Sequence, residues 1–230
     1  MASATRIVDN RTVVDELLAD LGRIPPPPGE PPDDGDVPRP PKEPEQRPLM
    51  ENAQLAMLIF LGAETVFFGA LIVAYLVSRL GMSAWPPPFQ PRLPIEVTGV
   101  NTLFLLASSV MMVKARRAVR RGDQTGFVRG LSQTAFLGAL FLAIQGYEWV
   151  RLVRFGLTVS SGIYGATFYT LIGTHGVHVL AAVTWLSVVL IQAARHRYSQ
   201  ASHLAVTVCG MYWHFVVGLW PILYTLVYLV

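Results

Sequence analysis

Five long apolar segments constrain the fold of this chain more than any other feature of its sequence. They cover about residues 53–78, 96–119, 128–152, 162–193 and 203–229. Each is long enough to cross a hydrocarbon core of about 30 Å as a helix. None alternates polar and apolar residues with the period of barrel strands. The sequence therefore predicts an all-α integral membrane protein, with a bundle of five transmembrane helices in residues 52–230.

Charge is scarce in the predicted membrane domain. Charged residues make up 14% of the 230 residues, against about 25% in soluble domains. Residues 52–230 contain 12 Lys and Arg but only 4 Asp and Glu. The basic residues flank the apolar segments, so we expect no nucleic-acid partner. Cys209 is the only cysteine, which excludes an intramolecular disulfide and a cysteine-rich metal site.

The positions of the basic residues predict the orientation. One side of the segments has Arg39, Lys42, Arg47, Lys114, Arg116, Arg117, Arg120, Arg121, Arg129, Arg195 and Arg197, and the other has only Arg79, Arg92, Arg151 and Arg154. Because Lys- and Arg-rich loops stay cytoplasmic, we expect the N-terminus in the cytoplasm and the C-terminus outside. Trp85, Trp149 and Trp220 are expected at the outer membrane interface. The predicted location is the inner (cytoplasmic) membrane of a bacterium, as a multi-pass protein.

Residues 1–51 form a different kind of segment, predicted to be a cytoplasmic proline-rich tail. From Pro25 to Pro48, 11 of 24 residues are proline, which favours an extended, semi-rigid spacer. Before it, apolar residues between positions 13 and 21 share one helical face, which predicts a short amphipathic helix. Two interpretations stay open: the helix docks on a partner subunit, or the tail is frayed.

Two glutamates lie within the apolar segments. Glu64 is near the middle of the first, with no arginine at its depth, so we expect it to be protonated or hydrogen-bonded. A buried ionisable group in a membrane is a functional candidate. The alternatives are a proton-linked or partner-facing site, and a polar contact between helices. Glu148 precedes Arg151 by three residues, a spacing that predicts a structural ion pair.

Three histidines are the remaining candidates. His175 and His178 are three residues apart, so their side chains should share a helical face. His214 lies midway between Gly210 and Gly218, which would let another helix approach closely. Three histidines on neighbouring helices could bind a metal or haem, but no carboxylate is in register with them, and hydrogen bonds across the bundle are commoner. We therefore expect no catalytic, cofactor-binding or metal-binding residue on this chain.

Five motifs occur in order along the membrane part. They are LGAETVFF at 61–68, NTLFLLASS at 101–109, QGYEW at 145–149, the stretch 164–179 with THGVHV, and YWHFV at 212–216. In this order the motifs resemble those of subunit III of the haem-copper cytochrome c oxidases, over about residues 55–229.

The resemblance implies a non-catalytic core subunit of an aerobic terminal oxidase, which reduces oxygen to water and pumps protons. Such a subunit would stabilise subunit I and support proton uptake or oxygen access. It implies subunit I as the main partner, then subunit II, with further respiratory-complex subunits reached through the tail. Haem and copper would lie on partner subunits, and a phospholipid could bind to this chain.

Several features depart from the family pattern. Longer members have seven helices, of which the first two form one wall of a lipid-holding cleft, and this chain retains five. Thr207 and Val217 stand where the family often has acidic residues. Two alternatives therefore stay open. One is a subunit-III-like accessory protein of a nitric oxide reductase system, and the other is an autonomous proton-linked channel or transporter.

Overall fold

The structure is a computed structural model that describes residues 51–88, 90–91, 93–198 and 203–229. Its elements are all helical: α2 (Asn52–Leu80), α3 (Ile95–Arg120), α4 (Gln124–Arg154), α5 (Ile163–Phe168), the π-helical η1 (Tyr169–Gly173), α6 (Thr174–Ala194), α7 (Leu204–Tyr224) and the π-helical η2 (Thr225–Leu229). The predicted amphipathic helix and proline-rich stretch of the tail lie outside the described residues.

Five of these helical stretches are long and apolar enough to cross a membrane. They are α2, α3, α4, the continuous helix α5–η1–α6, and α7 with η2. The described residues contain no strand. The prediction of an all-α protein with five membrane-spanning helices is therefore confirmed for this part of the chain.

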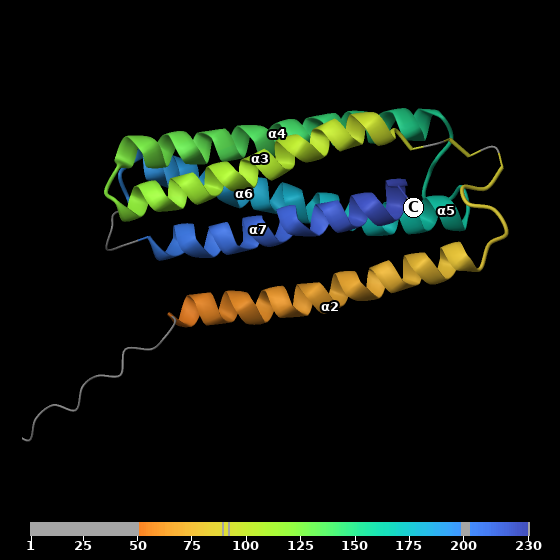
Figure 1. Ribbon diagram of the computed structural model, residues 1–230, viewed down its shortest axis with the longest axis horizontal. Helices are drawn as coiled ribbons and strands as arrows, with labels where there is room; N and C mark the ends of the chain where they lie inside the picture. The colour runs from red at the N-terminus through yellow and green to blue at the C-terminus, as the bar shows by residue number, and fades with distance from the viewer. Residues whose placement is uncertain (1–50, 89, 92, 199–202, 230) are drawn as a thin grey trace, which may run out of the picture. The chain divides into compact units, whose positions relative to one another are not determined.

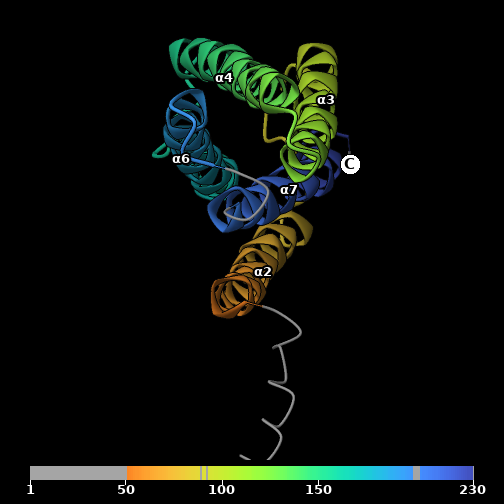
Figure 2. The ribbon, with the colours of Figure 1, turned by 90° about the vertical axis from the view of Figure 1, so that its left-hand side faces the viewer.

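Four of the helices form a closed ring, and the fifth lies outside it. Each of α3, α4, α6 and α7 packs against two others of the four, as the end view shows (Figure 2). α2 packs against α7 and against α5 and η1, outside the ring (Figures 1 and 2). The membrane domain is thus a four-helix bundle with one peripheral helix.

α7 and α2 differ sharply in how much of their surface the rest of the chain covers. In the most apolar stretch of α7, 61% of residues are buried, against 6% in α2. Phe68 and Tyr75 are the buried residues of α2. α7 is therefore the central element, and most of the apolar surface of α2 is left for lipid or another chain.

Polar side chains join α3 to α7 inside the ring. Trp213 Nε1 donates to Ser108 Oγ at 3.2 Å, and Trp220 Nε1 donates to Thr102 Oγ1 at 2.8 Å. Each bond satisfies a buried indole N–H that has no water to meet it in a bilayer. Trp220 is 1% exposed, so the expectation that it lies at the outer interface is wrong. The bond to Thr102 holds its ring inside the bundle.

A short turn and a close approach hold α3 against α4. Asp123 Oδ1 accepts a hydrogen bond from the Gly126 N–H at 2.8 Å, which caps α4 and starts it four residues before the predicted segment. Further along, Gly130 faces Ala115 so closely that a Cβ on the glycine would lie 2.8 Å from the alanine Cβ. Both helices would have to separate to admit a side chain there.

We predict that Gly130→Val destabilises the bundle, because the added side chain would overlap the α3 backbone. Overpacking of this kind costs about 1–3 kcal/mol, and it should lower the midpoint of thermal unfolding followed by tryptophan fluorescence. Gly62→Val is the control, since a Cβ at Gly62 has no atom within 4 Å. Equal midpoints for the two variants would show that α3 and α4 are not held this closely.

Candidate functional site

Glu64 of α2 has a partner on α6. Its Oε2 lies 3.0 Å from Nε2 of His178, and the side chains of Glu64 and His178 are only 16% and 20% exposed. Oε2 is out of line with the ring, so the pair is in close polar contact without an aligned hydrogen bond. The expectation that no carboxylate is in register with the histidines is therefore corrected, because α2 brings Glu64 to His178.

A second contact defines the tautomer of His178. Its Nδ1 lies 2.8 Å from the carbonyl oxygen of Thr174. A carbonyl oxygen only accepts, so Nδ1 must carry a hydrogen. A neutral His178 therefore has a bare Nε2 that faces the carboxyl group of Glu64.

Aromatic rings surround the pair. The ring centroid of His178 lies 5.0 Å from that of Phe68 and 6.4 Å from that of Phe67, both on α2. His175 also lies against Phe68, at 6.2 Å, so the prediction that the two histidines share a face is confirmed. Apolar walls strengthen the electrostatic interaction between Glu64 and His178, since they exclude water.

The helix that bears both histidines contains a wide turn just before them. η1 ends at Gly173, and Thr174, whose carbonyl contacts His178, begins α6. A π-helical turn adds a residue to the helix, which rotates the following face by about 100°. Such turns are frequent at functional sites. The wide turn thus sets which side of α6 meets α2.

His175 and His214 have partners other than Glu64. His175 is 1% exposed and stacks on Trp220, with ring centroids 5.2 Å apart. His214 Nδ1 lies 2.7 Å from Ser109 Oγ of α3. No group of three His, Cys, Asp or Glu residues in the described part of the chain could hold a metal ion. Within the described residues, His175 and His214 therefore have different partners and do not meet at one point.

Gly210 and Gly218, which flank His214, differ in how closely another helix approaches them. A Cβ at Gly210 would lie 2.8 Å from Cδ of Arg116, so α3 approaches closely there, as expected. A Cβ at Gly218 would have no atom within 4 Å, so the expected approach at that glycine does not occur within the described residues.

Glu148 and Arg151 form the ion pair that their spacing predicts. Arg151 Nη1 lies 3.0 Å from Oε1 and 3.2 Å from Oε2 of Glu148. The glutamate side chain is 6% exposed and the arginine side chain 46%. Arg151, which is partly exposed, therefore pairs with the buried carboxylate of Glu148 at the end of α4. The geometry is that of a structural ion pair.

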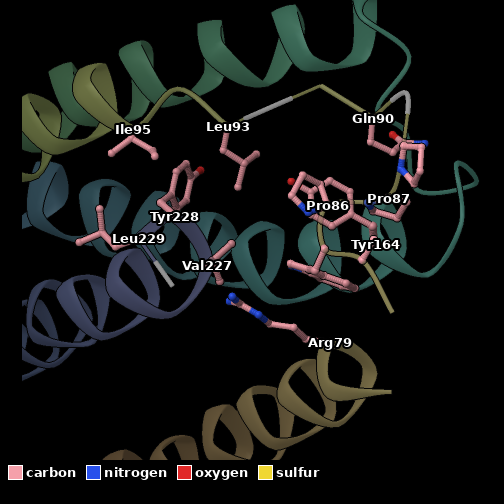
Figure 3. Close-up of a pocket in the computed structure, with 13 residues that line it drawn as sticks. Arg79, Pro86, Pro87, Gln90, Leu93, Ile95, Tyr164, Val227, Tyr228 and Leu229 are labelled. Atoms are coloured by element: carbon pink, nitrogen blue, oxygen red, sulfur yellow. The ribbon is translucent and has the colours of Figure 1, made fainter. Parts of the chain in front are cut away.

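A cavity of about 660 Å³ lies at the same end of the bundle, between α2, the proline-rich loop and η2 (Figure 3). Arg79 points into it from α2, and its Nη1 donates to the carbonyl oxygen of Leu226 at 3.3 Å. Trp85 of the loop donates to the Tyr75 hydroxyl at 3.2 Å. Gln90 Nε2 donates to the carbonyl oxygen of Ser161 at 3.3 Å. The last two bonds tie the loop to α2 and to the segment just before α5, and the Arg79 bond ties α2 to η2.

Together, these features define a class: a multi-pass α-helical membrane protein with a carboxyl–imidazole pair inside the membrane domain. A family model described as Cytochrome c oxidase subunit III matches residues 45–230. The chain belongs to the cytochrome c oxidase subunit III family.

Curated relatives agree with this family over most of their length. A protein named Cytochrome c oxidase subunit 3 from Synechocystis sp. is 39% identical over 174 residues, which are 75% of this chain and 73% of the relative. Proteins of the same name from Corynebacterium diphtheriae and Bacillus subtilis are 35% and 34% identical. The matched regions cover 80% and 82% of this chain and 90% and 92% of those two relatives.

The resemblance predicted from the five motifs is therefore confirmed. The chain is an accessory subunit of an aerobic terminal oxidase, which is an oxidoreductase complex of the respiratory chain, and its partners are oxidase subunits. The motifs at 61–68 and 164–179 contain Glu64 and His178, so two of the five motifs meet in the structure.

We predict that Arg151→Met destabilises the bundle by about 1–2 kcal/mol, because it leaves the Glu148 carboxylate buried without its cation. The double variant Glu148→Gln/Arg151→Met should recover part of this loss, since it removes the unpaired charge. Thermal unfolding of the purified complex measures both. Arg154→Met, an exposed arginine at the same end of α4, is the control. If the double variant were no more stable than Arg151→Met, the loss would not come from an unpaired carboxylate, and the ion pair would contribute nothing to stability.

Proposed function

We propose that this chain stabilises the catalytic subunit of the oxidase and supports proton uptake through Glu64 and His178. One observation carries the proposal, namely the 3.0 Å contact between Oε2 of Glu64 and Nε2 of His178 inside the membrane domain. A carboxyl group in such a place is expensive unless it is neutral or paired. Here it lies against a ring nitrogen that can accept a proton once the two groups come into line.

The proton chemistry follows from the two protonation states of the pair. With the proton on Glu64, both groups are neutral, and with the proton on His178 Nε2, the pair is a carboxylate and an imidazolium. Moving the proton from Glu64 to His178 keeps the net charge at zero but creates two buried charges, and their mutual attraction offsets part of the desolvation cost. Loss of that proton would leave a net negative charge, which favours rapid reprotonation. The pair is thus suited to hold one proton for a neighbouring subunit.

The proposed placement in the membrane follows from charge. The turn between α3 and α4 and the start of α2 lie at one end of the bundle (Figure 1), and this turn is the basic one. We place this end in the cytoplasm and the C-terminus outside, in the inner membrane of a bacterium. Subunit I is the proposed main partner, followed by subunit II. Docking of further respiratory-complex subunits on the tail remains a prediction.

The proposed cofactors lie elsewhere in the complex. Haem and copper are assigned to the partner subunits, in keeping with the different partners of His175, His178 and His214. A bound phospholipid would find a cation for its phosphate at Arg79, which lines the 660 Å³ cavity.

We predict that a tagged copy of this chain purified in mild detergent brings down a complex with the optical bands of haem and with bound copper. The same chain produced alone should be colourless, because its histidines do not converge. Oxygen consumption by the complex, compared with nitric oxide consumption, separates an oxidase from a nitric oxide reductase. Stoichiometric haem or copper on the chain alone would contradict the assignment of cofactors to partners.

We predict that Glu64→Gln assembles normally but shortens the working life of the enzyme. The amide keeps the shape and can donate to His178, but it cannot hold a transferable proton. The initial rate of oxygen reduction should stay close to wild type, while the number of turnovers before inactivation falls and proton uptake slows. Dicyclohexylcarbodiimide, which attacks neutral carboxyl groups in apolar sites, should label wild type at Glu64.

Two further variants complete this test. Glu96→Gln removes an exposed carboxylate of α3 and should behave as wild type. Glu64→Lys should fail to assemble, because it places an unpaired cation beside His178 at a cost of several kcal/mol. Unaltered proton uptake and lifetime in Glu64→Gln would reduce the pair to a contact between helices.

A further inference from the structure

A second cavity lies between α4 and the continuous helix η1–α6, away from Glu64. Its volume is about 290 Å³, and α4 and α6 are neighbours in the ring (Figure 2). Val177 and Leu180, which line it, are 65% and 56% exposed, so its mouth faces the outside of the bundle. Trp220 and His175 line its inner part and are each 1% exposed. The cavity therefore runs from the lipid-facing surface toward the core.

Missing side chains create this space. A Cβ on Gly146 of α4 or on Gly173 of η1 would have no atom within 4 Å, and both glycines line the cavity. Gly176 has the opposite role, because a Cβ there would lie 2.6 Å from the ring of Trp149. The indole therefore packs directly on the α6 backbone and forms one wall.

Three residues of the lining have buried polar atoms without a hydrogen-bond partner. They are Oε1 of Gln145, Nε1 of Trp149, and both ring nitrogens of His175. Gln145 is 4% exposed and His175 is 1% exposed. Buried polar groups are nearly always hydrogen-bonded, and more strictly so in a bilayer. Four such atoms beside one cavity indicate that something in the cavity meets them.

The chemistry of these atoms describes the ligand. The indole and one nitrogen of a neutral imidazole donate, while the glutamine oxygen and the other nitrogen accept. Gln145 Nε2 is held by the Tyr228 hydroxyl at 3.3 Å, so the amide oxygen is the free acceptor. The described lining residues include no Asp, Glu, Lys or Arg. The ligand is therefore neutral, with a group that donates or accepts hydrogen bonds and an apolar remainder.

We propose that the α4–α6 cavity binds a neutral membrane-soluble molecule through a hydroxyl or carbonyl group, with its apolar body toward Val177 and Leu180. Such a molecule enters from the bilayer, because that is where the mouth opens. A quinone or quinol and a glycerolipid with a free hydroxyl share this chemistry. The site is separate from Glu64 and His178, and it stands whether or not that pair serves proton uptake.

The test uses the intact oxidase complex and a photoreactive alcohol. The probe is 3-azioctanol, and its hydroxyl-free counterpart 3-azioctane serves as the matched probe. We expect the alcohol to label peptides from residues 141–149 and 172–180 saturably, and excess 1-octanol to displace it. Competition by decylubiquinone would identify the ligand as a quinone or quinol, and competition by dioctanoylglycerol would identify it as a glycerolipid. If neither compound competes, the proposal is overturned.

Two variants separate the cavity from its polar atoms. Gly146→Leu places a side chain in the space, where a Cβ meets no atom within 4 Å, and should abolish saturable labelling. Gly218→Leu, at another open glycine, should leave the labelling unchanged. His175→Phe keeps a ring against Trp220 but removes both nitrogens. It should weaken binding of the alcohol probe by about tenfold, which is the effect of one lost buried hydrogen bond. Labelling by the hydroxyl-free probe should not change.

Three results would overturn the proposal. The first is labelling that never saturates, which would mean simple partition into lipid. The second is equal labelling in wild type and Gly146→Leu, which would place the probe elsewhere. The third is cross-linking of residues 141–149 or 172–180 to a partner subunit in place of the probe, which would show that protein fills the cavity.

Discussion

The hydrocarbon core of a membrane offers no water to polar groups, and this constraint explains most of the contacts in the bundle. Each buried hydrogen-bond donor must find an acceptor on the same chain, on a ligand or on a partner. Trp213 and Trp220 reach hydroxyl groups of α3, and His214 reaches Ser109. Glu64 reaches His178. Shape alone would allow several arrangements of five apolar rods, but these pairings select one.

The five helices could be predicted because hydropathy and length are local properties. The ion pair of Glu148 with Arg151 was also accessible, since three residues along one helix always bring side chains together. The shared face of His175 and His178 follows from the same geometry. The contact of Glu64 with His178 could not be derived this way, because it depends on α2 lying beside α6. The one signal for this contact in the sequence was that a carboxyl group and an imidazole each lie in a recognisable motif.

The predictions for Trp220 and Gly218 were wrong because they rest on general rules that take no account of packing. Tryptophan is common at membrane interfaces, but Trp220 lies inside the ring because Thr102 accepts its N–H and His175 stacks on its ring. Gly210 and Gly218 are equally far from His214 in the sequence, and within the described residues a close approach of another helix occurs at Gly210 alone. The unpartnered atoms of Gln145 and His175 were also beyond prediction, since no pattern in the sequence marks a polar group that lacks a partner.

The position of Glu64 and His178 on separate helices has a consequence for the synthesis of the chain. The ribosome makes α2 before α6, so Glu64 enters the bilayer while its imidazole has yet to be translated. During that interval a charged carboxylate would oppose insertion of α2, and the protonated form is the cheaper one. The order of synthesis thus separates insertion of the Glu64 carboxyl group from the arrival of its partner His178.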